Sequence, residues 1–105
     1  MNQDELLVTK ETQGSNVRFI LRGRVNINNS PLLEFELAEA LKNKEIYIVL
    51  NMSQVYFLSS AGIRVILKMH KKALESKGSF GIEDPSENVR NVIGMTALDE
   101  LLVKK

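Results

Sequence analysis

The sequence predicts an α/β fold in which a mixed sheet of four to five strands begins with an N-terminal hairpin and has helices packed against it. Three observations lead to this prediction. Two strand-like segments flank the turn-forming stretch TQGSN, a nearly continuous apolar run occupies residues 46–52, and helix and strand patterns alternate after the hairpin. Crossovers between parallel strands of such a sheet are expected to be right-handed.

The first third of the chain predicts the hairpin and a loop. The segment DELLVTKE has strand composition, and the turn that follows it centres on Gly14. Val17, Phe19 and Leu21 then alternate with their neighbours, which predicts a strand with one face buried more deeply than the other. We expect residues 24–31 to form a loop that leads into a helix.

A first helix is predicted at the end of that loop. Ser30 can cap it, and Pro31 suits the first helical position because the N–H that proline lacks would be unpaired there. The basic stretch KNKE should end the helix. Apolar residues recur between these ends at helical spacing: Leu33, Leu37, Ala40 and Leu41.

The second half of the chain predicts two strands and two helices. The run IYIVLNM lacks alternation, which predicts a central strand covered on both faces, with SQV as a short connection after it. A helix should follow Gly62 and end near Lys77 and Gly78. SFGIED predicts a strand, PSENVRNVIGM predicts a helix, and the type of the element after Met95 is left open. The apolar face of the helix after Gly62 should hold Ile63, Ile66, Leu67, His70 and Leu74.

Size and charge narrow the function. The chain has 105 residues, which suits one domain over residues 1–105, and its formal net charge of +1 provides no basic stripe for nucleic acid or membrane. It has no cysteine, so neither a disulfide nor a thiolate metal site is expected. Neither a secretory signal nor an apolar run of about 18 residues is present. We therefore expect a cytoplasmic protein without direct contact to nucleic acid or membrane.

The most informative motif is Ser59-Ser60-Ala61-Gly62, which separates two apolar runs. A serine nucleophile would need a general base, and the one histidine, His70, lies about 15 Å along the predicted helix from Ser60. The motif also lacks the G-x-S-x-G and S-x-x-K patterns of serine enzymes. We therefore expect no enzyme, no cofactor and no metal.

Two other roles for these serines stay open. A serine before a helix caps it by accepting a bond from free backbone N–H groups, worth about 1 kcal/mol. A phosphate is also favoured there, because a helix N-terminus offers unpaired donors and about half a positive charge. Ala61 and Gly62 would leave room for a modifying enzyme. Arg64, four residues after Ser60, could pair with the phosphate, although a solvated surface arginine is the alternative.

The segment IVLNMSQVYFLSSAGIRVIL resembles the signature of STAS-domain proteins, above all the bacterial anti-sigma factor antagonists. In that family a buried strand leads into an Asp-Ser-Ser/Ala-Gly loop and then into a helix. Aligned through Phe57 and Gly62, Ser60 falls on the phosphoacceptor serine and Ala61 on the small residue after it. The segments LRGRVN and VIGMTALDELL also resemble the family, so the resemblance covers nearly the whole chain and implies a STAS-like fold.

The resemblance implies a binding protein that phosphorylation switches. Such proteins, when unphosphorylated, bind an anti-sigma factor that is also a serine kinase, and so free sigma factor for transcription. The kinase uses ATP to phosphorylate the serine and the complex dissociates, after which a metal-dependent serine phosphatase restores the binding form. A phosphate adds a charge of about −1.5 to −2, which opposes binding in a packed interface.

Two positions depart from the family's pattern. Ser59 stands where the family usually has an aspartate, and Asn26 stands at the aspartate of an earlier turn. Without these two negative charges, phosphorylation of Ser60 is expected to be slower or to need a specialised kinase. Ser59 is the second choice of acceptor, and a protein that always binds, without a switch, is the alternative.

The expected partner surface consists of two loops and the start of a helix, which meet if the crossovers place both loops at one end of the sheet. It comprises Asn26, Asn28, Ser59, Ser60, Ala61, Gly62, Arg64 and Lys68. We expect a monomer or a weak dimer. Three alternatives remain: a STAS scaffold with a different partner, a ligand-binding signalling module whose helix N-terminus holds a free anion, and a structural subunit.

Overall fold

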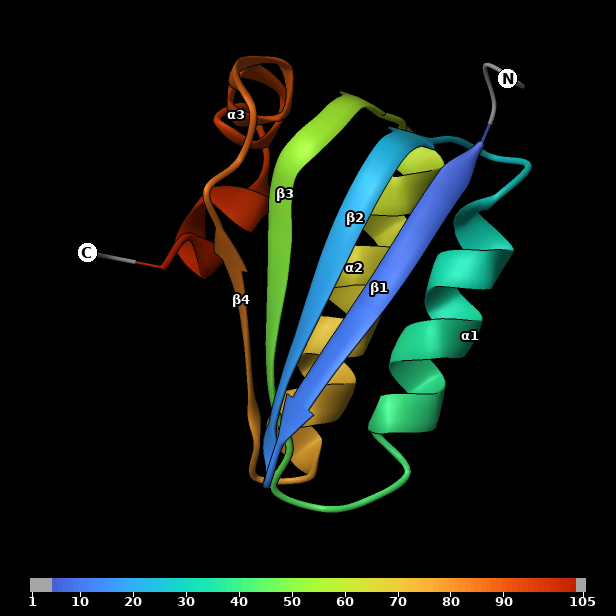
Figure 1. The fold of residues 1–105 in the computed structure, drawn as a ribbon. Helices are drawn as coiled ribbons and strands as arrows, with labels where there is room; N and C mark the ends of the chain where they lie inside the picture. The colour runs from blue at the N-terminus through green and yellow to red at the C-terminus, as the bar shows by residue number, and fades with distance from the viewer. Residues whose placement is uncertain (1–4, 104–105) are drawn as a thin grey trace.

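The computed structural model describes residues 5–103 and has a mixed α/β architecture (Figure 1). Its four strands form one sheet in the order β1-β2-β3-β4, with β1 antiparallel to β2 and the other neighbours parallel. The prediction of a mixed sheet that begins with a hairpin is confirmed, with four strands. The elements are β1 (Leu6–Gln13), β2 (Asn16–Val25), α1 (Ser30–Ala40), β3 (Tyr47–Leu58), α2 (Ser60–Glu75), β4 (Ser79–Glu83), α3 (Glu87–Ile93) and the 3-10 helix η1 (Ala97–Leu101).

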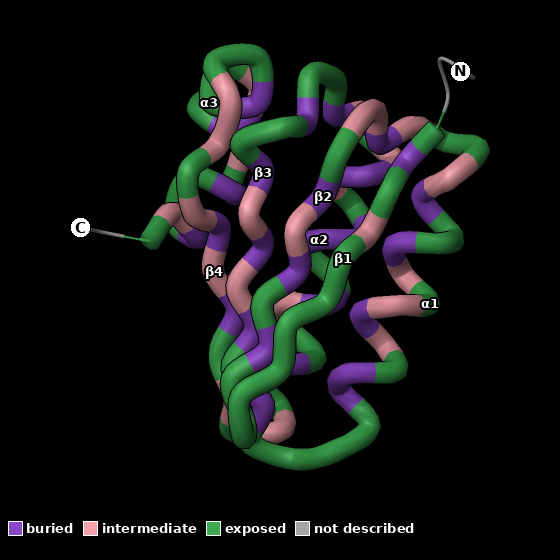
Figure 2. Tube along the Cα trace, viewed as in Figure 1, coloured by how far each residue is buried: buried purple, intermediate pink, exposed green. Residues whose placement is uncertain are grey.

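Helices α1 and α2 lie side by side behind the sheet and run in the same direction, whereas α3 and η1 lie at the β4 edge (Figure 1). The core fills the space between the sheet and α1 and α2, where buried residues alternate with exposed ones along the strands (Figure 2). Burial of each large apolar side chain contributes about 1.5–3 kcal/mol. The fully buried side chains include Phe19, Leu21, Leu33, Leu37, Ile48, Leu50, Ile66 and Ile82.

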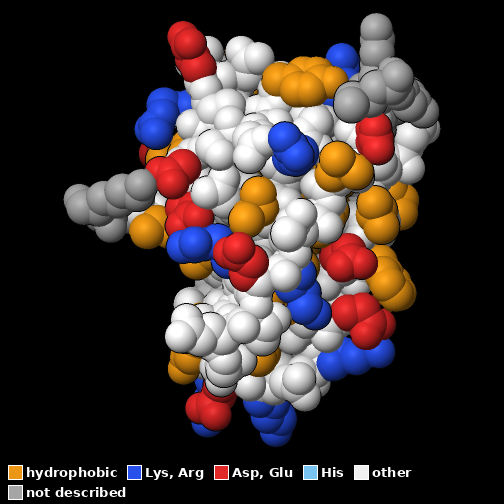
Figure 3. All heavy atoms as spheres, viewed as in Figure 1, with side chains coloured by type: hydrophobic (Ala, Val, Ile, Leu, Met, Phe, Trp, Pro, Cys, Tyr) orange, Lys and Arg blue, Asp and Glu red, His pale blue; other side chains and the backbone are white. Residues whose placement is uncertain are grey.

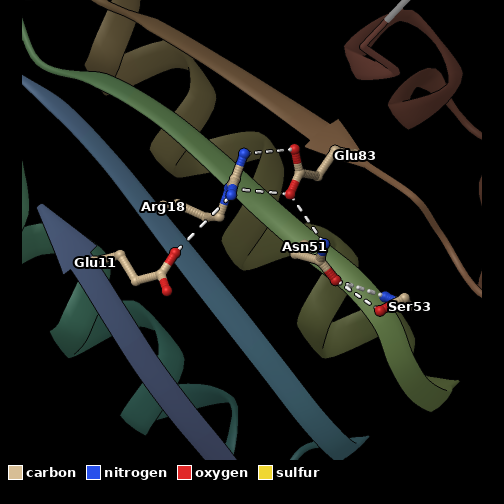
Figure 4. A network of polar contacts seen from close by, with 5 residues as sticks. All are labelled: Glu11, Arg18, Asn51, Ser53 and Glu83. Atoms are coloured by element: carbon tan, nitrogen blue, oxygen red, sulfur yellow. Dashed lines mark hydrogen bonds and ion pairs between the residues drawn. The ribbon is translucent and has the colours of Figure 1, made fainter. Parts of the chain in front are cut away.

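The other face of the sheet has no helix over it within residues 5–103 and carries acidic, basic and apolar side chains intermixed (Figure 3). Arg18 on β2 reaches across β3 to Glu83 on β4, with 3.0 Å between Nε and Oε2, and it lies 3.9 Å from Glu11 on β1 (Figure 4). Asn51 on β3 donates to Glu83 at 2.9 Å and accepts from the Ser53 hydroxyl at 2.8 Å. This ladder links all four strands on the uncovered face.

Strand β3 differs from its prediction in two ways. It continues without a break to Leu58, so the stretch SQV belongs to the strand. It is also covered on one face only, because Ile48, Leu50 and Met52 are buried while Tyr47 is 41% exposed. Strand β3 can extend beyond the end of β4 because Ser86, in the loop after β4, donates its N–H to the Met52 carbonyl at 3.1 Å.

The ends of the elements also correct several predictions. Strand β2 runs to Val25, so the first two residues of the predicted loop are strand. Ser30 is buried as the first residue of α1 and is not its cap. Beyond α2, Lys77 rather than Gly78 has the left-handed φ, at 62°. Gly78 is needed for another reason, because a Cβ there would overlap the carbonyl oxygen of Ile46.

The buried face of α2 is rotated from the predicted one. It holds Val65, Met69 and Ala73 beside the correctly predicted Ile66, whereas Leu67 and Leu74 are 37% and 53% exposed. His70 is half-buried, with its ring edge-on to the Phe80 ring at 6.3 Å between centroids. Two overlapping apolar stripes run along this helix, and periodicity alone could not select the one that faces the sheet.

The C-terminal part contains the predicted helix, and the structure shows the type of the element after Met95. Helix α3 begins after Ser86 and buries Val89 and Ile93, with Val92 packed partly against the core. The element whose type was open is η1, capped by Thr96. No helix in the part of the chain that the structure describes is long and apolar enough to cross a membrane.

Candidate functional site

The β2–α1 loop (residues 26–29) and the start of α2 meet at one end of the sheet, at the top of Figure 1. The direct link is a hydrogen bond from the Ser59 N–H to the Val25 carbonyl, 2.9 Å long. Strands β2 and β3 are parallel and neighbouring, with Val25 paired to Leu58, so both chains leave the sheet at the same point. We call this end, formed by residues 24–29 and 56–64, the tip.

The β2–α1 loop is held in shape by two asparagines. The Asn26 side-chain oxygen accepts from the N–H groups of Asn28 and Asn29, both at 3.0 Å. The Asn29 side chain accepts from the Asn26 N–H at 2.9 Å and donates to the Arg24 carbonyl at 2.9 Å. Asn26 therefore builds the loop as a carboxylate oxygen would, but without a charge. Asn28 is exposed on the outside of the turn.

The two serines of the motif occupy different positions at the start of α2. Ser59 is the N-cap, and its half-buried Oγ accepts from the Gly62 N–H at 3.2 Å. Ser60 is the first helical residue and is exposed. Within residues 5–103 no hydrogen bond engages the Ser60 hydroxyl, so this oxygen is available to another molecule.

Gly62 serves close packing, which corrects the expectation that it leaves room for a modifying enzyme. It is buried, and a Cβ there would lie 2.6 Å from Cγ1 of Val25 and 2.8 Å from Cδ1 of Leu58. The absence of a side chain lets α2 approach the ends of β2 and β3 and so fixes the height of Ser60 above the sheet. Ala61 is half-buried beside it.

The two basic residues of the predicted surface have different surroundings. Arg64 is exposed, lies one turn from Ser60 on the same side of α2, and forms no ion pair with any described residue. Lys68 lies about 12 Å along the helix from Ser60, and its Nζ is 3.0 Å from Oε2 of Glu34 on α1. Arg64 thus belongs to the tip, whereas Lys68 lies at its margin and joins the two helices.

Three further residues of the tip were not predicted. The Arg24 guanidinium lies over the Phe57 ring at 4.6 Å from its centroid, and 5.7 Å from that of Tyr56. Tyr56 is 51% exposed, and the buried Nε of Arg24 has no hydrogen-bond partner among the described residues. In the sequence, VYFL is recognisable only as an apolar run before the serine motif. The signal that could have identified this cluster is the pairing of β2 with β3, which sets Arg24 opposite Phe57.

The tip has positive potential, and the histidine of the chain lies far from it. The first turn of α2 has no acidic residue, while its N-terminus and Arg64 supply positive potential. His70 is ten residues along α2 from Ser60, about 15 Å away, and contacts Phe80 instead. No cluster of three or more potential metal ligands occurs within residues 5–103.

The chain belongs to the STAS domain family, whose model matches residues 8–105. Over 72 residues it is 35% identical to BtrV of Bordetella bronchiseptica, a protein named provisionally as an anti-sigma factor antagonist. That match covers 69% of this chain but spans only 62% of the length of BtrV. The predicted resemblance to STAS proteins and to the antagonists among them is therefore confirmed.

Solved structures of anti-sigma factor antagonists have the same fold. Unphosphorylated SpoIIAA superposes with a TM-score of 0.83 at 18% identity, covering 94% of this chain and 88% of that one. For SpoIIAA of Bacillus in its phosphorylated form the TM-score is 0.76 at 17% identity, covering 94% and 91%. An antagonist from Mycobacterium paratuberculosis gives 0.84 at 22% identity, covering 96% and 86%. At these identities the likeness shows the fold.

Proposed function

We propose that residues 1–105 act as one STAS domain with the function of an anti-sigma factor antagonist, a non-enzymatic binding protein whose docking is switched by phosphorylation of Ser60. The observation that carries the proposal is the exposed Ser60 hydroxyl, which no described residue engages, at the first position of α2. The names of BtrV and SpoIIAA support the antagonist function, and SpoIIAA is known in both phosphorylation states.

Ser60 is favoured over Ser59 as the acceptor because of their surroundings. Modification of Ser59 would have to disturb the half-buried oxygen that caps α2. A kinase can approach Ser60 from solvent without breaking any bond of the domain. The free N–H groups at the helix start and the Arg64 guanidinium then stabilise the phosphate once it is attached.

The phosphate releases the partner by changing the charge of the tip. Without it, the tip is positive, because it contains Arg24 and Arg64 and no acidic residue. A phosphate adds about −1.5 to −2 charges and must be desolvated inside an interface. A penalty of about 3 kcal/mol would weaken binding more than a hundredfold.

The docking surface that we propose is the tip, with Asn26, Asn28, Ser59, Ser60, Ala61 and Arg64 presented outward and Gly62 holding α2 in place. Lys68 contributes at the margin, where its pairing with Glu34 limits its reach. We add Arg24, Tyr56 and Phe57, since arginine and aromatic side chains dominate the binding energy of many interfaces.

The partners that fit this mechanism are an anti-sigma factor with serine kinase activity and a metal-dependent serine phosphatase that reverses the modification. The reaction transfers the γ-phosphoryl group of ATP to the Ser60 oxygen inside the kinase's own active site. This domain contributes the acceptor hydroxyl and the positive end of α2. The proposed place of action is the cytoplasm.

The test combines a binding assay with mass spectrometry. The unmodified chain and a Ser60→Asp variant are used as bait, and a Ser15→Asp variant, in the hairpin turn at the opposite end of the sheet, is the matched control. We expect an anti-sigma factor kinase to be retained by the unmodified chain and the control but lost from Ser60→Asp. With that kinase and ATP, intact mass should rise by about 80 Da in the wild type and in Ser59→Ala, and not in Ser60→Ala. Equal retention by all three baits, or no gain in mass, would reduce the domain to a passive adaptor.

A further inference from the structure

The outer surface of α1 and α2 carries opposite charges on its two helices. Helix α1 has three acidic residues (Glu34, Glu36, Glu39) and no basic one, which gives −3. Helix α2 has four basic residues (Arg64, Lys68, Lys71, Lys72) and one acidic residue (Glu75), which gives +3 with a neutral histidine. The two helices of one layer are therefore charged equally and oppositely.

Most of this charge is not neutralised within the chain. Among residues 5–103, one ion pair links the two helices, from Glu34 to Lys68, and Glu39 pairs with Lys42 just beyond the end of α1. Arg64, Lys71 and Lys72 form no ion pair within residues 5–103. The same surface exposes apolar side chains on both helices, since Phe35 is 59%, Leu32 45% and Leu67 37% exposed.

We propose that a second copy of this chain covers the layer, in a two-fold dimer that packs α1 of each copy on α2 of the other. The two helices run in the same direction, so a two-fold axis parallel to them and midway between them brings α1 onto the other α2 twice (Figure 1). The acidic helix then meets the basic one at both contacts. This complementarity favours a second copy over a partner of one charge sign.

The register of the dimer follows from the ion pair within the chain. Because Glu34 contacts Lys68, these residues lie at one level along the layer, and the axis preserves levels. Phe35 and Leu67 are the exposed apolar residues at that level, so each Phe35 meets Leu67 of the other copy. One turn further, Glu39 lies within a helical turn of Lys71 of the other copy. An apolar centre is thus flanked by a charge pair on either side of the axis.

The size of the contact indicates a weak dimer. Helix α1 has 11 residues and is about 16 Å long, and two adjacent helices are about 20 Å wide, so the overlap covers roughly 300 Å² in projection. Standard interfaces bury about 800 Å² of accessible surface per partner. We therefore expect a dissociation constant of roughly 0.1 mM, with dimers formed only at high local concentration.

The dimer would also bear on docking, a consequence that rests on the proposed function. Its contact covers Arg64 and Lys68, which lie next to Ser60 and at the margin of the tip. A docked partner and a second copy therefore compete for one surface. Dimerisation itself does not depend on that partner, so it can be tested on the purified chain alone.

The test is sedimentation equilibrium of the full chain from about 10 μM to about 1 mM. We expect a concentration-dependent shift from monomer to dimer that Phe35→Glu abolishes. Glu39→Lys and Lys71→Glu should each weaken the dimer about tenfold by creating two like-charge contacts, and the combined variant should restore it. Leu7→Glu, at a 45% exposed residue on the uncovered face of the sheet, is the control and should leave the dimer unchanged.

Each possible result either supports or overturns the proposed dimer, provided that circular dichroism shows each variant to be folded. A chain that stays monomeric up to about 1 mM would overturn it. A dimer that survives Phe35→Glu, or that is lost in Leu7→Glu, uses another face and would also overturn it. If the combined charge swap fails to restore what the single changes weaken, the register is wrong.

Discussion

At the scale of single residues, two neighbouring serines of identical chemistry take different roles because of where α2 begins. Ser59 has an extended backbone, with φ −83° and ψ 168°, and turns its oxygen back onto the Gly62 N–H. Ser60 is the first helical residue and is exposed, and no described residue bonds to its hydroxyl. The same peptide therefore places a structural oxygen and an exposed, unbonded one side by side.

The first prediction separates these two oxygens. Ser59→Ala should lower the free energy of unfolding by about 1 kcal/mol, because the Gly62 N–H loses its acceptor. Ser60→Ala should change it by less than about 0.5 kcal/mol, as is usual for exposed positions. Urea denaturation with unchanged m-values measures both. Equal losses in the two variants would show that the cap is shared and would weaken the assignment of Ser60 as the free hydroxyl.

Some of these residue roles could be predicted from the sequence and some could not. A serine directly before an apolar helical pattern indicates a cap, but the pattern does not specify which of two serines is the N-cap. The role of Asn26 was hidden as well, because its bonds to Asn28 and Asn29 depend on the path of the loop. Gly62 was explained by access, whereas its contacts with Val25 and Leu58 come from distant segments.

At the scale of elements, the extension of β3 beyond β4 is what carries Ser59 and Ser60 to the tip. The segment after Met52 has lost its β4 neighbour, and Ser86 and Asn88 supply hydrogen bonds instead. The Ser86 hydroxyl donates to the Val55 carbonyl, and the Asn88 amide donates to the Tyr56 carbonyl at 3.0 Å. Helix α3 thereby supports the strand that positions Ser59 and Ser60.

The second prediction concerns this support. Ser86→Ala should lower the free energy of unfolding by about 2 kcal/mol, since it removes both the bond to Val55 and the cap that accepts from the Val89 N–H at 3.2 Å. Ser86→Thr keeps the hydroxyl and is the matched control. Hydrogen exchange of the Val89 amide should accelerate in Ser86→Ala only. An unchanged exchange rate would mean that α3 holds its place without this cap.

The helices and strands themselves were predicted better than the residues at which they begin and end. Period and composition identified both strands of the hairpin, α1, β4 and α3, because these segments have clear apolar alternation or helical spacing. Strand β3 was cut short because Ser53 and Gln54 look like a loop, and nothing local shows that Ser86 pairs with the strand beyond them. The face of α2 was wrong because Leu67 and Leu74 are as apolar as the residues that are buried.

At the scale of the whole molecule, the two faces of the sheet are stabilised differently, one by the helices and the other by the ladder of polar contacts. One face is stabilised by burial under α1 and α2, which depends on apolar area. The other face is tied by the chain of contacts from Glu11 through Arg18 to Glu83 and Asn51. Glu83 has a side chain only 13% exposed, so its contacts are shielded more than those of an ordinary surface pair.

The third prediction measures this ladder by a double-mutant cycle on Arg18→Met and Glu83→Gln. We expect a coupling of about 1 kcal/mol at low salt, because Arg18 contacts Glu83 through Nε at 3.0 Å and a second nitrogen at 3.3 Å. At about 1 M salt the coupling should fall by roughly half, since Arg18 is 50% exposed. The exposed pair Glu39–Lys42 serves as the comparison and should give about 0.3 kcal/mol. A coupling no larger than that would mean that the contact between Arg18 and Glu83 stabilises the sheet no more than an exposed ion pair does.

The path of the chain at its two described ends determines how the protein can be handled in the laboratory. Near the beginning, the Arg24 N–H donates to the Glu5 carbonyl at 3.3 Å, so the chain enters β1 right beside the tip. Near the end, the Val103 N–H donates to the Ile82 carbonyl at 2.8 Å, on the far side of the sheet (Figure 1). A purification handle or sensor-chip linker should therefore be attached at the C-terminal end. Fused at the other end, it would crowd the tip, where we propose that partners bind, and would lower the measured affinity.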